Sequence, residues 1–229
     1  MRRAFPILAI FTALFLSYVL YQALVVAPTD AAQGDVYRII YYHVPSAWTT
    51  FLLFTINFVA SIVYLIRRNP KADIVALVSA EVGVVFCTVV LVTGPLWARP
   101  VWGIWWTWDV RLTSTLVLWL IYVAYLMLRK FSSGGQTPVL AAVLAVFGAL
   151  DVPLVYFSIW FFRTQHPQPV VGQGGYIDPA MLRVWLLSWA AFLCFAFLVC
   201  WSRYRLEVLQ REVDEAHAMR SLTAAGGSR

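Results

Sequence analysis

The sequence predicts an all-α, polytopic membrane protein, a six-helix bundle with both termini in the cytoplasm. Of the 229 residues, 62% are hydrophobic and only 12% carry a formal charge, which is about half the charged share of an ordinary soluble domain. Apolar stretches long enough to cross a bilayer recur along the chain, and basic residues gather in alternate connections between them. This composition excludes soluble enzymes, nucleic-acid binders and disordered hubs.

Six stretches reach the roughly 17 to 25 apolar residues that a transmembrane helix needs. They are 4–27, 44–66, 74–96, 112–128, 139–160 and 184–202. The first follows Arg2 and Arg3, but its apolar run exceeds the roughly 7 to 15 residues of a signal-peptide core, so we expect a retained anchor. The short connections predict one membrane domain over residues 1–203 and a cytoplasmic tail over residues 204–229.

The distribution of cations predicts the orientation. With the N-terminus in the cytoplasm, 12 of the 17 Lys and Arg residues fall in inner segments and 5 in outer segments, in agreement with the cytoplasmic excess of cations in membrane proteins. The net charge of +6 therefore indicates membrane topology before it indicates a basic binding surface. The outer connections 28–43, 97–111 and 161–183 hold two of the three histidines and a tryptophan cluster. We expect function on this outer face.

Four of the 11 tryptophans lie between positions 102 and 108, namely Trp102, Trp105, Trp106 and Trp108. Tryptophan is common at membrane interfaces, so an aromatic belt is one interpretation. Clustering is not needed for a belt, however, and four rings in so short a segment favour a platform for a flat, conjugated ligand. Asp109, which follows the cluster, could cap the next helix, position this loop, or both.

Two histidines, His43 and His166, lie in different connections of the outer face. A single interfacial histidine is usually only hydrogen-bonded, but two beside an aromatic platform and five arginines suit a haem. Haem needs axial imidazoles for its iron and cations for its propionates. By charge and position, Arg38 and Arg111 are the best candidates for propionate contacts, and a lipid phosphate is the alternative partner.

The cysteines indicate that any haem is held noncovalently, as haem b. Cys87, Cys194 and Cys200 fall inside predicted spans, where cysteine usually behaves as a small hydrophobe. The sequence contains no CxxC and no CxxCH pattern, so thioether attachment is not expected. A zinc site would need a third or fourth ligand that these residues do not supply.

The tryptophan segment resembles a known family. The run from Trp102 to Ser114, read with 34–45, Leu91-Val-Thr-Gly94 and 153–166, is similar to cytochrome c maturation protein C, also called haem exporter protein C. The larger relatives typically carry Asp-Pro-Lys-Glu-Thr after the tryptophans, whereas Val-Arg-Leu-Thr-Ser follows Asp109 here. The resemblance covers roughly residues 28–185.

The resemblance implies a protein of the bacterial inner membrane that binds and transfers haem and is not an enzyme. Members hold haem at the periplasmic face and pass it to a haem chaperone, maturation protein E. Their partners in the membrane are the ABC transporter subunits, maturation proteins A and B, and the small maturation protein D. His43 and His166 match the axial ligands, and the signature loop is matched by Trp102, Trp105, Trp106, Trp108 and Asp109. The partners expected are these proteins and membrane lipid, with no nucleic acid.

Two acids, Glu81 and Asp151, lie inside predicted spans. An intramembrane acid is often functional, so either could take part in the passage of haem or protons. Both could instead make interhelical hydrogen bonds, and Pro153 is expected to kink its helix. A small-molecule transporter could use these acids and the tryptophan loop as its path, although it should show broken helices in matched halves. A b-type cytochrome electron carrier is disfavoured, because both outer histidines lie on one face.

Overall fold

The structure, a computed structural model, describes residues 4–132, 134–167 and 177–226. In these residues, six helical segments are long and apolar enough to cross a membrane. The elements in chain order are α1 (Ala4–Tyr21), η1 (Gln22–Val26), η2 (Asp35–Ile39), α2 (Ile40–Arg67), α3 (Pro70–Trp102), α4 (Val110–Phe131), α5 (Thr137–Ala149), α6 (Asp151–Phe161) and α7 (Pro179–Gly226). The predicted all-α bundle with six spans is confirmed.

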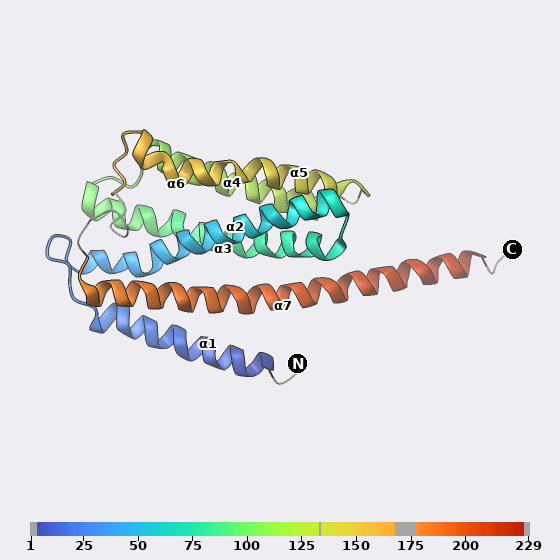
Figure 1. Cartoon of the computed structure of the whole chain (residues 1–229), viewed down its shortest axis with the longest axis horizontal. Helices are drawn as coiled ribbons and strands as arrows, with labels where there is room; N and C mark the ends of the chain where they lie inside the picture. The colour runs from blue at the N-terminus through green and yellow to red at the C-terminus, as the bar shows by residue number, and fades with distance from the viewer. Residues whose placement is uncertain (1–3, 133, 168–176, 227–229) are drawn as a thin grey trace.

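The helices lie nearly parallel to one long axis, in layers (Figure 1). Helices α4, α5 and α6 form one layer, α2 and α3 the next, and α7 lies between this hairpin and α1. The described parts of the three outer connections lie at one end of the bundle, which we call the histidine end. Both chain termini lie toward the opposite end, the terminal end, as an even number of spans requires.

The hairpin of α2 and α3 is closed by a turn at the terminal end. Arg68 caps α2 in the left-handed conformation with φ 52°, and Asn69 begins α3 by accepting a hydrogen bond from the Lys71 N–H at 2.9 Å. Pro70 occupies the first helical turn, where its missing N–H costs nothing. Across this hairpin, a Cβ on Gly83 would come within 2.6 Å of the Phe54 ring, so glycine is required for the close approach.

The fifth span is broken, as the sequence predicts from Pro153. The segment Thr137–Phe161 consists of α5 and α6, separated at Leu150. Proline offers no N–H to the carbonyl four residues earlier, that of Ala149, and its ring crowds that carbonyl. Asp151 therefore stands in the first turn of α6, and its Oδ2 atom is buried without a hydrogen-bond partner.

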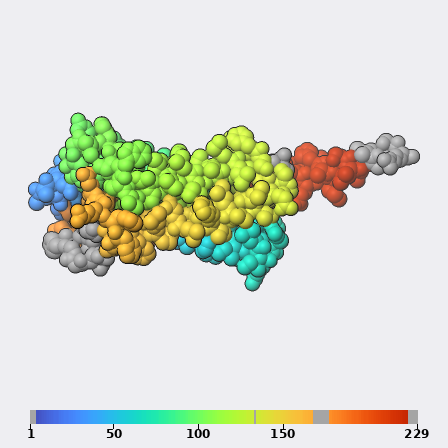
Figure 2. Space-filling model, turned by 90° about the horizontal axis from the view of Figure 1, so that it is seen from above, coloured from blue at the N-terminus to red at the C-terminus, as the bar shows by residue number. Residues whose placement is uncertain are grey.

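Helix α7 joins the sixth span to the predicted tail without interruption. It runs for 48 residues and continues past the rest of the bundle at the terminal end (Figures 1 and 2). Glu81 of α3 is paired with Arg203 of α7 by two hydrogen bonds of 2.8 and 2.9 Å, so this acid has a structural partner near the terminal end. Both side chains are about one-third exposed, at 29% and 34%.

A more deeply buried ion cluster joins three helices at the terminal end. Asp73 of α3, only 3% exposed, accepts hydrogen bonds from Arg129 of α4 at 2.6 and 2.8 Å and from Arg211 of α7 at 2.7 Å. The sequence placed Asp73 just outside a span and gave it no role. The structure shows that it connects the long helix α7 to the bundle.

The spans extend further toward the histidine end than their apolar runs predicted. Helix α2 begins at Ile40, so His43 lies in its first turns and Pro45 lies inside the helix, whereas the sequence placed His43 in a connection. Helix α3 continues to Trp102 and ends at Gly103, whose φ of 80° suits a glycine C-cap. Helices can continue through the interfacial region, where aromatic and polar residues replace aliphatic ones, so a search for apolar runs stops too early.

Candidate functional site

His43 is held between the two helices of the central hairpin. Its Nδ1 atom lies 2.9 Å from the Thr93 hydroxyl on α3. The edge of the ring also faces α3, since a Cβ on the adjacent Gly94 would lie 3.5 Å from the His43 Cε1 atom. Because His43 lies on helix α2 rather than in a loop, the backbone that carries this side chain is held in place by the helix.

His166 lies in the segment that follows α6. Its backbone N–H donates to the Thr164 hydroxyl at 3.0 Å, and its Nδ1 atom lies 2.9 Å from the Pro167 carbonyl oxygen. A carbonyl can only accept, so this contact places a hydrogen on Nδ1 and leaves the lone pair on Nε2. Burial, with help from the positive charge of Arg111, lowers the pKa of His166 to about 4. The imidazole is therefore neutral at physiological pH, as a metal ligand must be.

The two histidines lie close enough to interact, although they are far apart in sequence. His43 is within electrostatic reach of His166 and of Arg111, and His166 is within reach of Arg111 and Asp109. The fold thus brings together residues from all three predicted outer connections. His217, the third histidine, lies on α7 beyond the sixth span.

Asp109 caps α4, one of the roles that the sequence allows. Its Oδ1 atom accepts a hydrogen bond from the Leu112 N–H at 3.0 Å, and its Oδ2 atom accepts one from the Thr107 hydroxyl at 2.9 Å. The capping prediction is confirmed. Because the same carboxylate binds both the helix start and the preceding loop, it also fixes where the tryptophan segment joins α4.

Where rings of the tryptophan segment pair with one another or with Trp97, they meet edge to face. Trp106 and Trp108 are 5.8 Å apart at 76°, and Trp102 pairs with Trp97 at 4.9 Å and 77°. In each pair, only one ring can lie flat against a planar ligand. Trp105 and Trp108 are 56% and 77% exposed, whereas the Trp106 indole nitrogen is buried with no hydrogen-bond partner.

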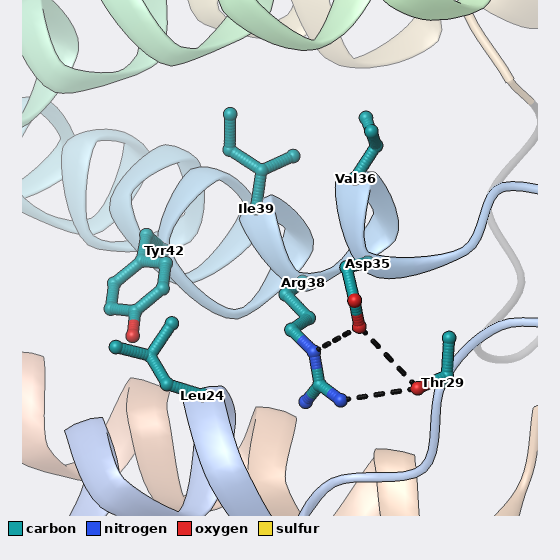
Figure 3. Close-up of a pocket in the computed structure, with 7 residues that line it drawn as sticks. All are labelled: Leu24, Thr29, Asp35, Val36, Arg38, Ile39 and Tyr42. Atoms are coloured by element: carbon teal, nitrogen blue, oxygen red, sulfur yellow. Dashed lines mark hydrogen bonds and ion pairs between the residues drawn. The ribbon is translucent and has the colours of Figure 1, made fainter.

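Arg38 and Arg111, the two predicted propionate contacts, differ in how many of their N–H donors are used within the chain. Figure 3 shows Arg38 pointing toward Asp35 and Thr29 in a hollow of about 680 Å³. It also donates to the carbonyls of Ala23 and Ala27, so four of its five N–H donors are used within the chain. Arg38 therefore holds the end of the first span, and the hollow beside it is lined by neither histidine.

Arg111 keeps an unused donor beside the histidines. It lies in the first turn of α4, and its Nη1 atom is buried without a hydrogen-bond partner. Among the residues that the structure describes, no carboxylate forms an ion pair with it. A buried cation with a free donor is the feature expected where an anionic group of a ligand binds.

Comparison with known proteins identifies the family. The profile of the family described as "Heme exporter protein C" matches residues 1–219. The chain belongs to the haem exporter protein C family. A haem exporter protein C of Bradyrhizobium diazoefficiens is 35% identical over 99% of this chain and 87% of its own length.

Two further haem exporter C proteins show how far the likeness extends. That of Haemophilus influenzae is 30% identical over 90% of this chain and 85% of its own length. That of Escherichia coli is 36% identical over 72% of this chain and 67% of its own length. The family resemblance predicted from the tryptophan segment is thus confirmed.

Two contacts were missed by sequence reasoning at the site. Thr93, which meets His43, was noticed only as part of the family resemblance. Gln33 accepts a hydrogen bond from the Trp97 indole at 2.8 Å and so ties the first outer connection to the end of α3. Neither polar residue stands out by composition, because each acts through a partner that is at least 50 positions away.

Proposed function

We propose that this chain binds one haem b noncovalently at the periplasmic face of the bacterial inner membrane and passes it on during c-type cytochrome biogenesis. The receiver is the periplasmic haem chaperone, maturation protein E, and maturation proteins A, B and D are the membrane partners. The convergence of His43 and His166 from separate elements is the observation that carries the proposal. Membership of the haem exporter protein C family supports it.

The donor set suits haem in three respects. Two imidazoles lie near each other, and His166 is neutral, so its Nε2 lone pair is available to iron. The buried Nη1 atom of Arg111 has no hydrogen-bond partner among the described residues, and a propionate would supply one. Trp106 offers an aromatic face and an unused indole N–H. Together these groups recognise the iron, the carboxylates and the flat ring of one molecule.

The exposure of the site suits a protein that passes its cargo on. Trp105 and Trp108 are largely exposed, and His166 is only half-buried. A haem held here would keep one edge open at the membrane surface, where a periplasmic acceptor can reach it. A permanent electron carrier would instead be expected to enclose its haem, and it would need further histidines at a second depth.

Arg111→Gln is expected to weaken the binding of ferric haem by roughly 10- to 100-fold, since a hydrogen bond to a charged group contributes about 1.5 to 3 kcal/mol. Titration of the detergent-solubilised, haem-free protein measures the dissociation constant. Arg183→Gln removes a charge from the exposed side of α7 near the same end and serves as the control. Equal affinities for the two variants would remove Arg111 from the site.

A transporter of another small molecule is the second candidate, and the structure supplies one observation for it. Asp151 lies at a break inside the fifth span with a buried, unpartnered oxygen. Glu81, the other acid of such a path, is paired with Arg203. Of the two acids, only Asp151 then remains for such a path, together with the tryptophan segment, and the haem proposal is favoured.

The haem content of the purified protein tests the proposal. The protein is produced in haem-replete cells, extracted in mild detergent, and assayed as the pyridine haemochrome before and after acidified-acetone extraction. We expect haem b that the solvent removes completely. Haem-free protein that still restores c-type cytochromes to a strain lacking its own haem exporter protein C would contradict the proposal.

A further inference from the structure

The His43 ring belongs to a hydrogen-bond chain whose direction can be assigned. The Thr93 hydroxyl lies 2.6 Å from the Val89 carbonyl oxygen and 2.9 Å from the His43 Nδ1 atom. A hydroxyl has a single hydrogen. The carbonyl can only accept, so the 2.6 Å contact uses that hydrogen, and the hydroxyl oxygen must accept from Nδ1–H. The reverse direction would bring two lone pairs together at 2.6 Å.

We propose that Thr93 is a positioning residue that fixes the Nδ1–H tautomer of His43 and presents its Nε2 lone pair to a ligand metal. This inference rests on the proposed function, in which that metal is haem iron. Metal-bound histidines commonly donate their second ring nitrogen to an oxygen acceptor, which sets the ring orientation and raises its basicity. Thr93 supplies that acceptor.

Threonine suits this position for two physical reasons. Its hydroxyl is bonded to the carbonyl of the preceding helical turn, which restricts the χ1 angle and holds Oγ1 in one place. The residue also belongs to α3, so the bond joins the two helices of the central hairpin. In the described part of the chain, the Nδ1 partner of His166 is instead the carbonyl of the next residue, Pro167.

The test separates the hydrogen bond from the volume of the side chain. Thr93→Val keeps the shape and removes the acceptor, and Thr93→Ser keeps the hydroxyl. Thr55→Val is the matched control, since the Thr55 hydroxyl makes the same bond to the previous turn, to the Phe51 carbonyl at 2.7 Å, on the neighbouring helix. The yield and thermal stability of each variant in detergent show whether it is folded.

The first measurement uses haem-free protein labelled with ¹⁵N-histidine. The chain has only three histidines, so single-histidine variants assign the signals. In the wild type and in Thr93→Ser and Thr55→Val, we expect the His43 nitrogens to report Nδ1–H and an unprotonated Nε2. In Thr93→Val this preference is lost. His43 signals that are unchanged in Thr93→Val would overturn the inference.

The second measurement is ferric haem affinity. We expect about 10- to 100-fold weaker binding in Thr93→Val, the usual effect of losing an outer-shell partner, with recovery in Thr93→Ser. Equal losses in Thr93→Val and Thr93→Ser would show a steric role and overturn the inference. If the wild type shows the expected tautomer but binds no haem, the proposed function fails and the Thr93–His43 bond stands.

Discussion

His43→Ala and His166→Ala should each abolish haem retention by the purified protein. Each substitution removes a ligand, and we expect affinity to fall by more than about 100-fold, because the loss of an outer-shell partner alone typically costs about 10- to 100-fold. The chain has no third histidine at the histidine end to replace either one. The ratio of haem to protein after size-exclusion chromatography measures the effect.

His217→Ala is the matched control for both variants. This histidine lies on the tail part of α7, beyond the predicted sixth span and far from the histidine end. It should retain haem at the wild-type ratio. Near-wild-type haem in either His43→Ala or His166→Ala, with a folded protein, would show that the affected histidine is not a ligand.

Asp73→Ala should produce the largest loss of stability. The change leaves the guanidinium groups of Arg129 and Arg211 without their shared acceptor, and Arg129 is only 10% exposed. Breaking a buried ion pair from one side typically costs about 3 to 5 kcal/mol. Denaturant unfolding in mixed micelles, followed by tryptophan fluorescence, measures this loss.

Glu81→Ala provides the comparison for Asp73→Ala. It breaks the pair with Arg203, whose two side chains are 29% and 34% exposed, so we expect a smaller loss of stability than for the more deeply buried Asp73. Equal stabilities for the two variants would show that burial of Asp73 does not strengthen the connection between α7 and the bundle.

The sequence predicts the spans well because a bilayer imposes one length and one composition on each of them. It predicts their outer ends less well, as His43 shows: helix α2 begins several residues before the apolar run and carries this histidine inside it. The break near Pro153 could be predicted, because the chemistry of proline is local. The helical spacing of Leu206, Leu209 and Val213 allows a helix in the tail, but it does not show that this helix continues the sixth span without interruption.

The residue types of the candidate site can be proposed from the sequence, but the arrangement of their side chains cannot. The histidines stand out because the chain has only three, and the tryptophans because four of the 11 lie between positions 102 and 108. The fold does bring His43 and His166 close together. The sequence cannot tell that Trp106 and Trp108 meet edge to face, or that Arg38 is hydrogen-bonded within the chain while the Arg111 Nη1 atom has no partner among the described residues. These distinctions depend on contacts between elements.

The stabilising role of Asp73 also depends on contacts between elements that the sequence does not reveal. The residue lies at the start of α3, where a carboxylate also suits the helix N-terminus, so its sequence position offers an ordinary explanation. Its partner Arg211 is 138 residues away. Only the packing of α7 against the hairpin brings the two together.

The central claim is that His43 and His166 bind the same iron. Low-temperature electron paramagnetic resonance of the ferric, haem-loaded protein tests this most directly, because the signal reports the number and type of axial ligands. We predict a single low-spin species with two imidazole ligands, converting to a high-spin signal in any haem that His43→Ala or His166→Ala retains. A high-spin or thiolate-ligated signal in the wild-type protein would contradict the claim.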